Sequence, residues 1–342
     1  MNILIDIGHP AHVHLFRNFI KHNKQKANKI LVTIRKREHI EELLKYYQID
    51  YVMLGPHKKN IISKIATLYY YNKKLYHLAK EFKPDIFLSH GSMYAAHVST
   101  LVDKPHISME DTEHSSEQIR LYKPFTDAIL TSNSFTKNLG SKQIRYNGYH
   151  ELAYLHPNYF KPDSSILDSL DIQKNEKYVI IRFVSWSASH DLGHDGLSLE
   201  TKRGIVKKLS KYARIVITSE VPLPNDLEKY RVPISSEKMH DALYYASLYV
   251  GEGATMASEA ACLGTPFVTC VSSHKIGYLI EQEIKYKLGF SRTELKDIVS
   301  KSIEILDGNI NPNMWIKRRE HMINSKIDVT KFLISTVEGW RK

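Results

Sequence analysis

The most restrictive feature of this sequence is a repeated alternation of short apolar runs with helix-type patterns. Six runs of strand length, rich in β-branched residues, occupy the first part of the chain, at 3–7, 30–34, 51–54, 86–88, 107–109 and 128–131. Between most of them lie stretches, such as 15–20 and 40–47, whose apolar residues are three and four apart. Strands that alternate with helices predict a parallel, doubly wound sheet.

A second alternating series follows a loop-rich connection at 147–163. Its apolar runs lie at 178–184, 214–218, 248–251 and 267–271. The 342 residues are more than one core usually serves, and two series indicate an α/β protein with two Rossmann-like domains facing a central cleft. We predict a first domain at 1–155 and a second at 156–325, with a last amphipathic helix within 326–342.

Charge and cysteine content limit the partners and the compartment. The net charge of +11 suits nucleic acid, an anionic membrane surface or anionic substrates. Zinc-finger spacing, RNA-binding aromatic motifs and an arginine-rich arm are missing from the sequence, so we expect no nucleic-acid partner. Cys262 and Cys270 lie in apolar segments and are expected to be reduced core residues. With no signal-peptide pattern and no run of about 20 apolar residues, we expect a cytoplasmic protein.

The segment 57–77 mixes five lysines with aliphatic and aromatic residues. A helix of this kind can rest on anionic lipid headgroups, which would place the protein at the inner face of the cell membrane. The alternative is an ordinary amphipathic helix with solvated lysines, to which we give about twice the weight.

The segment 248–270 carries the strongest functional pattern: a strand, a turn of small residues, a helix with one carboxylate, and a second strand. The turn and helix start, Gly253, Ala254, Thr255 and Met256, can bind a pyrophosphate through backbone N–H groups, because the helix dipole favours an anion there. Glu259 lies close enough to accept hydrogen bonds from a ribose. A turn without any ligand is the alternative, at roughly even odds from spacing alone. In the same half of the chain, Arg182 and the neighbouring hydroxyl of Ser185 can hold the second phosphate of a nucleotide sugar.

The first strand ends in a histidine-rich segment that contains His12 and His14. A histidine with a pKa near neutrality suits general base work on a sugar hydroxyl. The two residues are two positions apart and do not share a helix face, so we predict no metal pair there. A polar cap over the first βα turn is the alternative.

Ionisable residues crowd the end of the fifth strand, namely Glu110, Asp111, Glu113 and His114. Crowded like charges push pKa values apart, so one carboxyl can keep its proton at neutral pH. An acid/base site and a loop of solvated charges have about equal weight. The Gly and Ser of the segment 89–92, at the end of the fourth strand, are expected to cap the next helix, and the alternative is that they bind an acceptor sugar or an anion.

Four motifs together resemble GT-B-fold sugar-nucleotide enzymes. They are an opening similar to Asp-x-x-x-Pro-x-His-Val-His-Phe-Phe, a central Asp-x-Glu-His, Arg-Phe-Val-Ser-Trp followed by His-Asp, and Gly-x-Gly-x-x-Met-x-x-Glu-Ala-Ala-x-Leu-Gly-x-Pro. The likeness covers nearly the whole chain and points to a GT-B-like family of bacteria and archaea. This family is related to the non-hydrolysing UDP-N-acetylglucosamine 2-epimerases and to the lipid II-forming N-acetylglucosaminyltransferase.

The resemblance implies a last helix that crosses back to the first domain. It also places Glu220 where such proteins bind the nucleotide base. It favours His12 over His14, since His12-Val13 resembles a turn of the lipid II-forming enzyme. The epimerases carry a His-x-Glu-Ala-Gly type segment where this chain has Asp-x-Glu-His, and this departure counts against epimerase chemistry.

Three functions stay open. The first is a metal-independent glycosyltransferase that moves a sugar from a UDP-sugar, with a UDP-N-acetylhexosamine as the leading donor, to a surface-polysaccharide or glycolipid acceptor. There His12, Asp111 or Glu113 removes the acceptor proton, and the UDP-sugar is a substrate, so no cofactor is expected. The second is a UDP-N-acetylhexosamine 2-epimerase in which Asp111, Glu113 and His114 move protons at C2. The third is a non-enzymatic nucleotide-sugar-binding or scaffold protein.

Overall fold

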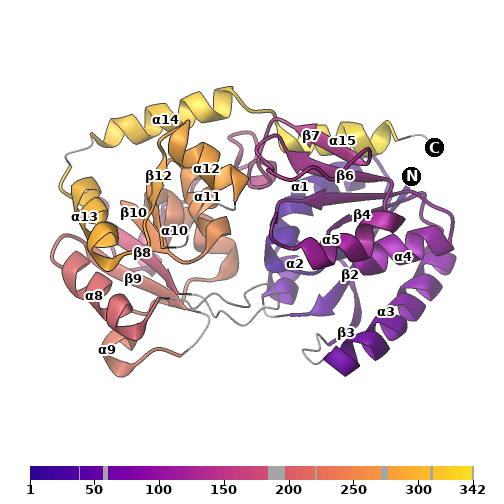
Figure 1. The fold of residues 1–342 in the computed structure, drawn as a ribbon, viewed down its shortest axis with the longest axis horizontal. Coiled ribbons are helices and arrows are strands. Elements are labelled where there is room, and N and C mark those ends of the chain that lie inside the picture. Colours follow the sequence, from indigo (N-terminus) through magenta and orange to yellow (C-terminus); the bar gives the residue numbers. More distant parts are fainter. Residues whose placement is uncertain are drawn as a thin grey trace. The chain divides into compact units, whose positions relative to one another are not determined.

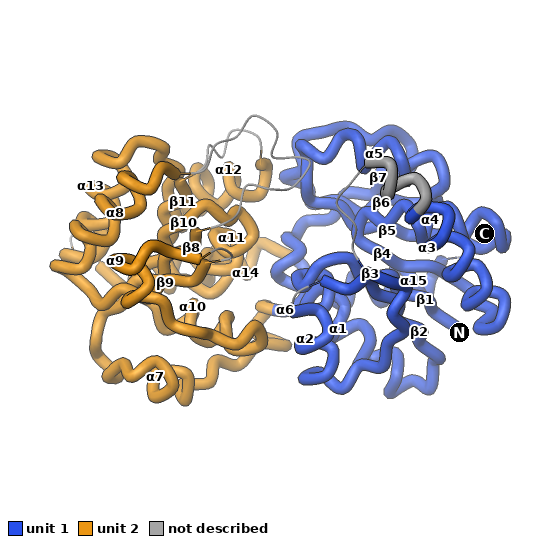
Figure 2. Tube along the Cα trace, turned by 90° about the horizontal axis from the view of Figure 1, so that it is seen from below, with its two compact units in different colours: residues 1–154, 327–342 blue, residues 155–326 orange. Residues whose placement is uncertain are grey.

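The computed structural model describes residues 1–37, 39–56, 61–183, 197–219, 222–270, 276–308 and 311–340, with the backbone alone for 61–66. The chain divides into two compact units (Figure 2). Unit 1 contains Met1–Tyr154 and Ile327–Lys342, and unit 2 contains Leu155–Lys326. Each unit is built around one parallel sheet with helices packed on it (Figure 1).

The sheet of unit 1 has seven parallel strands in the order β3-β2-β1-β4-β5-β6-β7. The strands are β1 (Asn2–Ile7), β2 (Lys29–Lys36), β3 (Val52–Pro56), β4 (Ile86–His90), β5 (His106–Glu110), β6 (Ala128–Ser132) and β7 (Gln143–Tyr146). The strands β1, β5 and β6 are nearly continuous runs of buried residues, as expected for strands of a parallel sheet that is covered on both faces.

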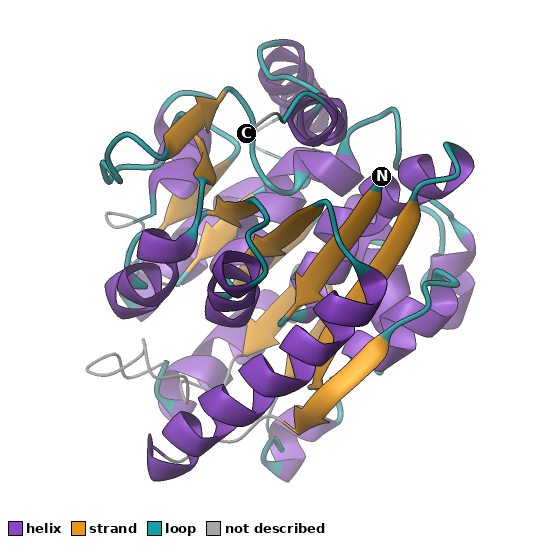
Figure 3. Ribbon diagram, turned by 90° about the vertical axis from the view of Figure 1, so that its right-hand side faces the viewer, coloured by secondary structure: helices purple, strands orange, loops and turns teal. Residues whose placement is uncertain are grey.

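Helices cover the sheet of unit 1 (Figure 3). They are α1 (Pro10–Gln25), α2 (Ile40–Tyr46), α3 (Ile61–Phe82), α4 (Met93–Leu101), α5 (Ser116–Tyr122), η1 (Lys123–Phe125), α6 (Leu152–Leu155) and α15 (Val329–Glu338). Helices α3 and α4 pack together over β1, β3 and β4 through a core that includes Leu75, Phe87 and Val98. The last helix, α15, returns to unit 1 and packs on α1.

The sheet of unit 2 has five parallel strands in the order β12-β11-β10-β8-β9. The strands are β8 (Tyr178–Phe183), β9 (Arg214–Ser219), β10 (Leu248–Gly251), β11 (Phe267–Thr269) and β12 (Gly289–Ser291). The helices are α7 (Ser165–Ser169), α8 (Leu199–Leu209), α9 (Asn225–Glu228), η2 (Ser236–Lys238), α10 (Met239–Tyr245), α11 (Ala254–Leu263), α12 (Gly277–Ile284), α13 (Leu295–Leu306) and α14 (Pro312–Asn324).

The expected strands lie within about two residues of the observed ones, and two strands were missed. In β7, Ile144 is exposed and only Tyr146 is well buried, so the segment lacks the apolar run that marks a central strand. In β12, a three-residue strand begins at Gly289. Both strands lie at a sheet edge, where burial and therefore the apolar signal are weaker.

The lysine-rich segment is only partly a solvated face. Lys74 of α3 donates from Nζ to the carbonyl oxygens of Met53 and Leu54, at 2.7 and 3.2 Å, and so ties α3 to β3. Lys73, Tyr69 and Tyr70 are exposed. Among the described residues, we find no helix with the length and apolarity needed to cross a membrane.

Candidate active site

The strand order of unit 1 reverses between β1 and β4, because β2 and β3 lie on one side of β1 and all later strands lie on the other. In open parallel sheets, ligands bind at the carboxyl ends of the strands at such a switch point. Residues that follow β1, β4 and β5 therefore meet at one edge. Asp6 is the register partner of Ser89, and His90 is that of Met109.

At this edge, the carboxylate of Asp111 lies between two imidazoles. Asp111 directly follows β5, and its Oδ1 is 3.1 Å from Nε2 of His90 at the end of β4. Its Oδ2 is 3.2 Å from Nδ1 of His150, which follows β7. The Thr112 hydroxyl also donates to Oδ1, at 2.8 Å. The three side chains are 22%, 12% and 7% exposed for Asp111, His90 and His150, so the cluster is largely removed from water.

The second nitrogen of His150 has a different environment. Its Nε2 is buried and has no hydrogen-bond partner among the described residues. Since Nδ1 faces the Asp111 carboxylate, the neutral ring carries its proton on Nδ1, and the lone pair of Nε2 is unused. A carboxylate that orients an imidazole with an open second nitrogen is the arrangement of a general base.

His12 lies in the first turn of α1 and stacks on His90, with ring centroids 4.4 Å apart. Burial, with the neighbouring His90, holds the pKa of His12 well below its ordinary value, so the ring is neutral near pH 7. Its Nδ1 accepts the backbone N–H of Gly8 at 3.3 Å. The proton of the neutral ring is therefore on Nε2, which makes His12 a hydrogen-bond donor in this arrangement.

The pKa values of the two adjacent carboxyl groups move in opposite directions. Burial raises the pKa of Glu110, whose Oε2 accepts the Tyr122 hydroxyl at 2.7 Å. Burial also acts to raise the pKa of Asp111, but His150 and His90 outweigh it and hold that pKa well below its usual range. For His90, burial favours the neutral ring, yet the Asp111 and Glu110 carboxylates raise its pKa to about 9. The two pKa values therefore move apart, and burial and the histidines cause this more than repulsion between the carboxyls does.

A buried ion pair supports the β1 side of this edge. The Asp6 carboxylate is fully buried and accepts Nη1 of Arg35 with both oxygens, at 3.0 and 2.7 Å. The Thr33 and Ser92 hydroxyls donate to the same carboxylate, and Ser92 also caps α4, as expected for 89–92. A Cβ on Gly8 would lie 2.5 Å from Nη2 of Arg35, so the turn after β1 needs a glycine.

The other three predicted catalytic residues lie in different surroundings. His14 is buried in α1 with its ring beside those of Tyr47 and Tyr154, with centroids 5.8 and 5.4 Å away. Glu113 is buried and accepts the backbone N–H of Thr136 with Oε1 at 3.2 Å. His114 is exposed. Of the five predictions, Asp111 lies between the imidazoles, and His12 stacks on one of them.

In unit 2, the predicted strand-turn-helix is present. Helix α11 begins at Ala254 with Gly253 as its N-cap, one residue earlier than a start at Thr255, and no side chain caps it. It ends at Gly264, whose φ of 89° is the left-handed conformation that glycine adopts readily. Gly251 has an internal role, since a Cβ there would lie 2.6 Å from the Tyr249 hydroxyl. The turn thus needs Gly251 for packing and leaves the first N–H groups of α11 uncapped by side chains.

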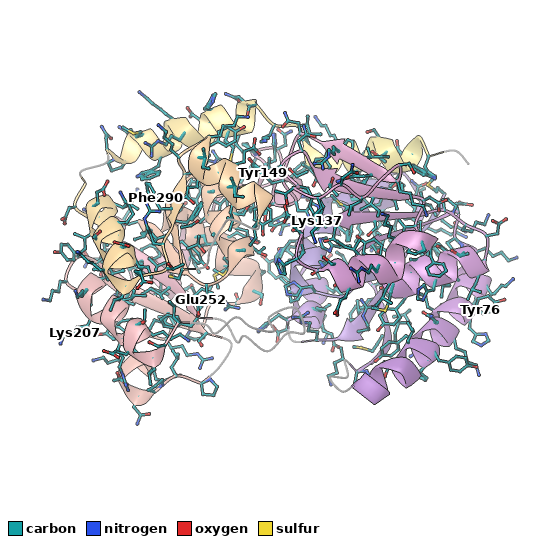
Figure 4. The ribbon with its side chains drawn as sticks, in the orientation of Figure 1. Tyr76, Lys137, Tyr149, Lys207, Glu252 and Phe290 are labelled. Atoms are coloured by element: carbon teal, nitrogen blue, oxygen red, sulfur yellow. The ribbon has the colours of Figure 1, made fainter. Side chains whose placement is uncertain are left out.

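Two acidic residues, one before α11 and one within it, have partners within unit 2. Glu259 is buried, and its Oε1 is 3.0 Å from Nε2 of His240. Glu252, which follows β10 (Figure 4), accepts the backbone N–H of Leu197 at 2.6 Å. Arg182 is half-buried at the end of β8. The two remaining predicted donor-binding residues, Ser185 and Glu220, lie outside the described residues.

Sequence reasoning missed His90 and His150. His90 could have been found by the switch-point rule, because the strand after the first crossover reversal lies beside β1. His150 follows β7, a strand without an apolar run, and no local pattern in the sequence marks it. Cys262 and Cys270 are both buried, and neither forms a disulfide.

Two parallel-sheet α/β units, joined by a last helix that returns to the first, define the GT-B fold. The chain matches known structures of this fold over almost its full length. The UDP-GlcNAc 2-epimerase from Neisseria meningitidis bound to UDP-GlcNAc is 14% identical, with a TM-score of 0.71, and the match covers 99% of this chain and 100% of that one. The glycosyltransferase VinC in complex with DTDP is 10% identical, with a TM-score of 0.65 and 99% of both chains covered.

The chain belongs to the family described as "Protein of unknown function (DUF354)", whose model matches residues 1–333. An uncharacterized protein of Methanocaldococcus jannaschii is 26% identical over 304 residues, which are 83% of this chain and 86% of that protein. The resemblance to GT-B sugar-nucleotide enzymes that the motifs indicated is thereby confirmed at the level of fold.

Proposed function

We propose that this protein is a glycosyltransferase that moves a sugar from a UDP-sugar, with a UDP-N-acetylhexosamine as the leading donor, to a hydroxyl of a surface polysaccharide or glycolipid. The observation that carries the proposal is the pair formed by Asp111 and His150, in which a carboxylate orients a buried imidazole whose Nε2 is also buried and has no hydrogen-bond partner among the described residues. The fold supports it, because structures of this fold include enzymes in complex with UDP-GlcNAc and with DTDP.

Unit 2 would bind the donor. The uncapped first turn of α11, at Gly253, Ala254, Thr255 and Met256, suits a pyrophosphate, because its N–H groups and helix dipole favour an anion. Arg182, Ser185 and Glu220 remain candidates for the second phosphate and the base. Glu259 would accept hydrogen bonds from the ribose while His240 holds its Oε1.

Unit 1 would supply the proton transfer. Nε2 of His150 takes the acceptor hydroxyl proton, and Asp111 stabilises the imidazolium that forms. The acceptor oxygen then bonds to the anomeric carbon, and the bond from that carbon to the phosphate oxygen breaks, with its electron pair leaving on UDP. Helix α11 and Arg182 stabilise the charge on UDP, so this reaction needs no metal ion.

Of the groups expected to act as base, His12 is better suited to donate a hydrogen bond from Nε2, because Gly8 occupies its Nδ1 lone pair. Asp111 is a weak base, since two histidines hold its pKa low. His14, Glu113 and His114 stay candidates for substrate contacts.

A 2-epimerase of UDP-N-acetylhexosamines is the second candidate. One observation favours it: the UDP-GlcNAc 2-epimerase from Neisseria meningitidis bound to UDP-GlcNAc shares the fold over 99% of this chain.

Calorimetry with UDP and UDP-N-acetylglucosamine tests the donor site, and nuclear magnetic resonance of the anomeric protons tests the reaction. Conversion of UDP-N-acetylglucosamine without an acceptor supports the epimerase, and UDP release that depends on an added glycolipid extract supports transfer. His150→Ala should lower the transfer rate about 10²- to 10⁴-fold with UDP affinity unchanged. His77→Ala, an exposed histidine of α3, is the matched control. Folded protein without affinity for UDP or UDP-sugars refutes the proposal.

A further inference from the structure

The cluster of His90, Asp111 and His150 also has the composition of a metal site. Each residue offers one donor atom, and the three donor atoms lie within 4.8 Å of one another. They come from three different places, the end of β4, the residue after β5 and the loop after β7. From the sequence we expected no metal site.

The distances match those between neighbouring ligands of one ion. Zinc binds imidazole nitrogen and carboxylate oxygen at about 2.0–2.2 Å, so adjacent ligands are about 3.0 Å apart in octahedral and about 3.4 Å apart in tetrahedral coordination. The observed separations are 3.1 Å for His90 Nε2 to Asp111 Oδ1 and 3.2 Å for His150 Nδ1 to Asp111 Oδ2. The two nitrogens face different oxygens of Asp111, so one ion bound by all three residues would need both carboxylate oxygens or a rotation of that side chain.

The donor set selects the kind of ion. Two imidazole nitrogens with one carboxylate suit transition-metal dications of the zinc class, whereas calcium and magnesium prefer oxygen ligands alone. Asp111 is the most exposed of the three side chains, at 22%. Its exposed side would let a metal ion enter and would let water act as a further ligand. The Thr112 hydroxyl on Asp111 and the His12 ring on His90 would hold two of the ligands in place.

We propose that His90, Asp111 and His150 bind a zinc-class dication and that its binding blocks sugar transfer. A neutral imidazole has one lone pair, so a metal ion on Nδ1 of His150 leaves the ring proton on Nε2. The nitrogen that would take the acceptor proton is then occupied. The inhibition rests on the proposed function, whereas the metal site does not.

Titration of the EDTA-stripped full chain with Co²⁺ tests the site, because Co²⁺ bound by nitrogen and oxygen has a visible absorption band. We expect each chain to bind one Co²⁺ ion tightly, and we expect Zn²⁺ to displace it. His90→Ala, Asp111→Asn and His150→Ala should each weaken Co²⁺ binding by more than about tenfold, the lower bound for changes in outer-shell partners. His77→Ala should leave it unchanged, since this residue is exposed on α3. Circular dichroism in EDTA checks that each variant is folded.

Anomalous diffraction from zinc-soaked crystals of the unaltered protein locates the ion without any variant. A peak between the three side chains supports the site, and peaks only at other histidines overturn it. Equal Co²⁺ affinity in the folded variants also overturns it. If the protein binds the metal ion but not UDP, the proposed transferase is refuted and the metal site is supported. If it binds UDP but no Co²⁺ tightly, the metal site is refuted and the proposed transferase is not.

Discussion

His106 provides a quantitative test of how burial controls this fold. It begins β5 and is fully buried, and burial lowers its pKa to about 3 from the ordinary 6.5. Its Nδ1 lies 2.9 Å from the Thr126 hydroxyl, which itself donates to the carbonyl oxygen of Tyr122. Its Nε2 lies 2.9 Å from the Ser89 hydroxyl. Thr126 therefore accepts from Nδ1–H and Ser89 donates to Nε2, a network that satisfies both nitrogens of the neutral ring.

The sign and size of the pH effect follow from these two pKa values. Between them, the unfolded chain binds a proton at His106 that the folded chain does not, so stability falls as pH falls. The slope is about 1.4 kcal/mol per pH unit once the unfolded histidine is protonated. Between about pH 7.5 and pH 5, His106 alone should lower the free energy of unfolding of unit 1 by about 2 kcal/mol.

The assay is urea unfolding at several pH values, read by a hydrogen-exchange pulse at one common pH and mass spectrometry of peptides from β4 and β5. His106→Ala should cost stability at every pH because of the cavity, and should reduce the difference between pH 7.5 and pH 5 by about 2 kcal/mol. His106→Asn replaces the alanine variant if that variant does not fold. The control variant His77→Ala should show the same pH dependence of the free energy of unfolding as the wild type. An unchanged pH dependence in folded His106 variants would show that this residue is not buried as a neutral ring.

Three further predictions follow from other contacts. Gly251→Ala should lower the stability of unit 2 by about 1–3 kcal/mol in denaturant unfolding, because the new Cβ would lie 2.6 Å from the Tyr249 hydroxyl; an unchanged midpoint would contradict this packing. Asp6→Asn should destabilise unit 1 by about 3–5 kcal/mol because it leaves the buried Arg35 charge unbalanced, and Asp6→Leu with Arg35→Met should recover part of the loss. Glu259→Gln should weaken UDP binding in calorimetry while thermal unfolding changes little, and equal affinity would remove Glu259 from the donor site.

Much of the fold follows from local pattern. The strands β1, β5 and β6 are buried runs whose limits differ from the expected ones by at most one residue, because burial on both faces gives a continuous apolar signal. Edge strands such as β7 lack that signal. Helix ends were predictable where chemistry marks them, as at Gly264, since only a few residue types adopt the left-handed backbone.

The candidate active site was harder to predict than the strands, because the sheet topology brings together residues that are far apart in the sequence. Asp111 stood out as one of several charges, but its two partners come from positions 21 and 39 residues away along the chain. His90 looked like part of a helix cap, and His150 lay in a segment expected to be a loop. The strand order brings these residues to one edge of the sheet, and local sequence patterns do not predict strand order.

The return of α15 to unit 1 has a consequence for how the protein is made. Val329, Leu333 and Val337 are fully buried, and the Thr330 hydroxyl donates to the carbonyl oxygen of Ala153 at 2.7 Å. On the ribosome, residues 1–154 emerge well before this helix, with all of unit 2 synthesised in between. The apolar side chains of α1 that α15 covers therefore stay exposed until α15 has been synthesised.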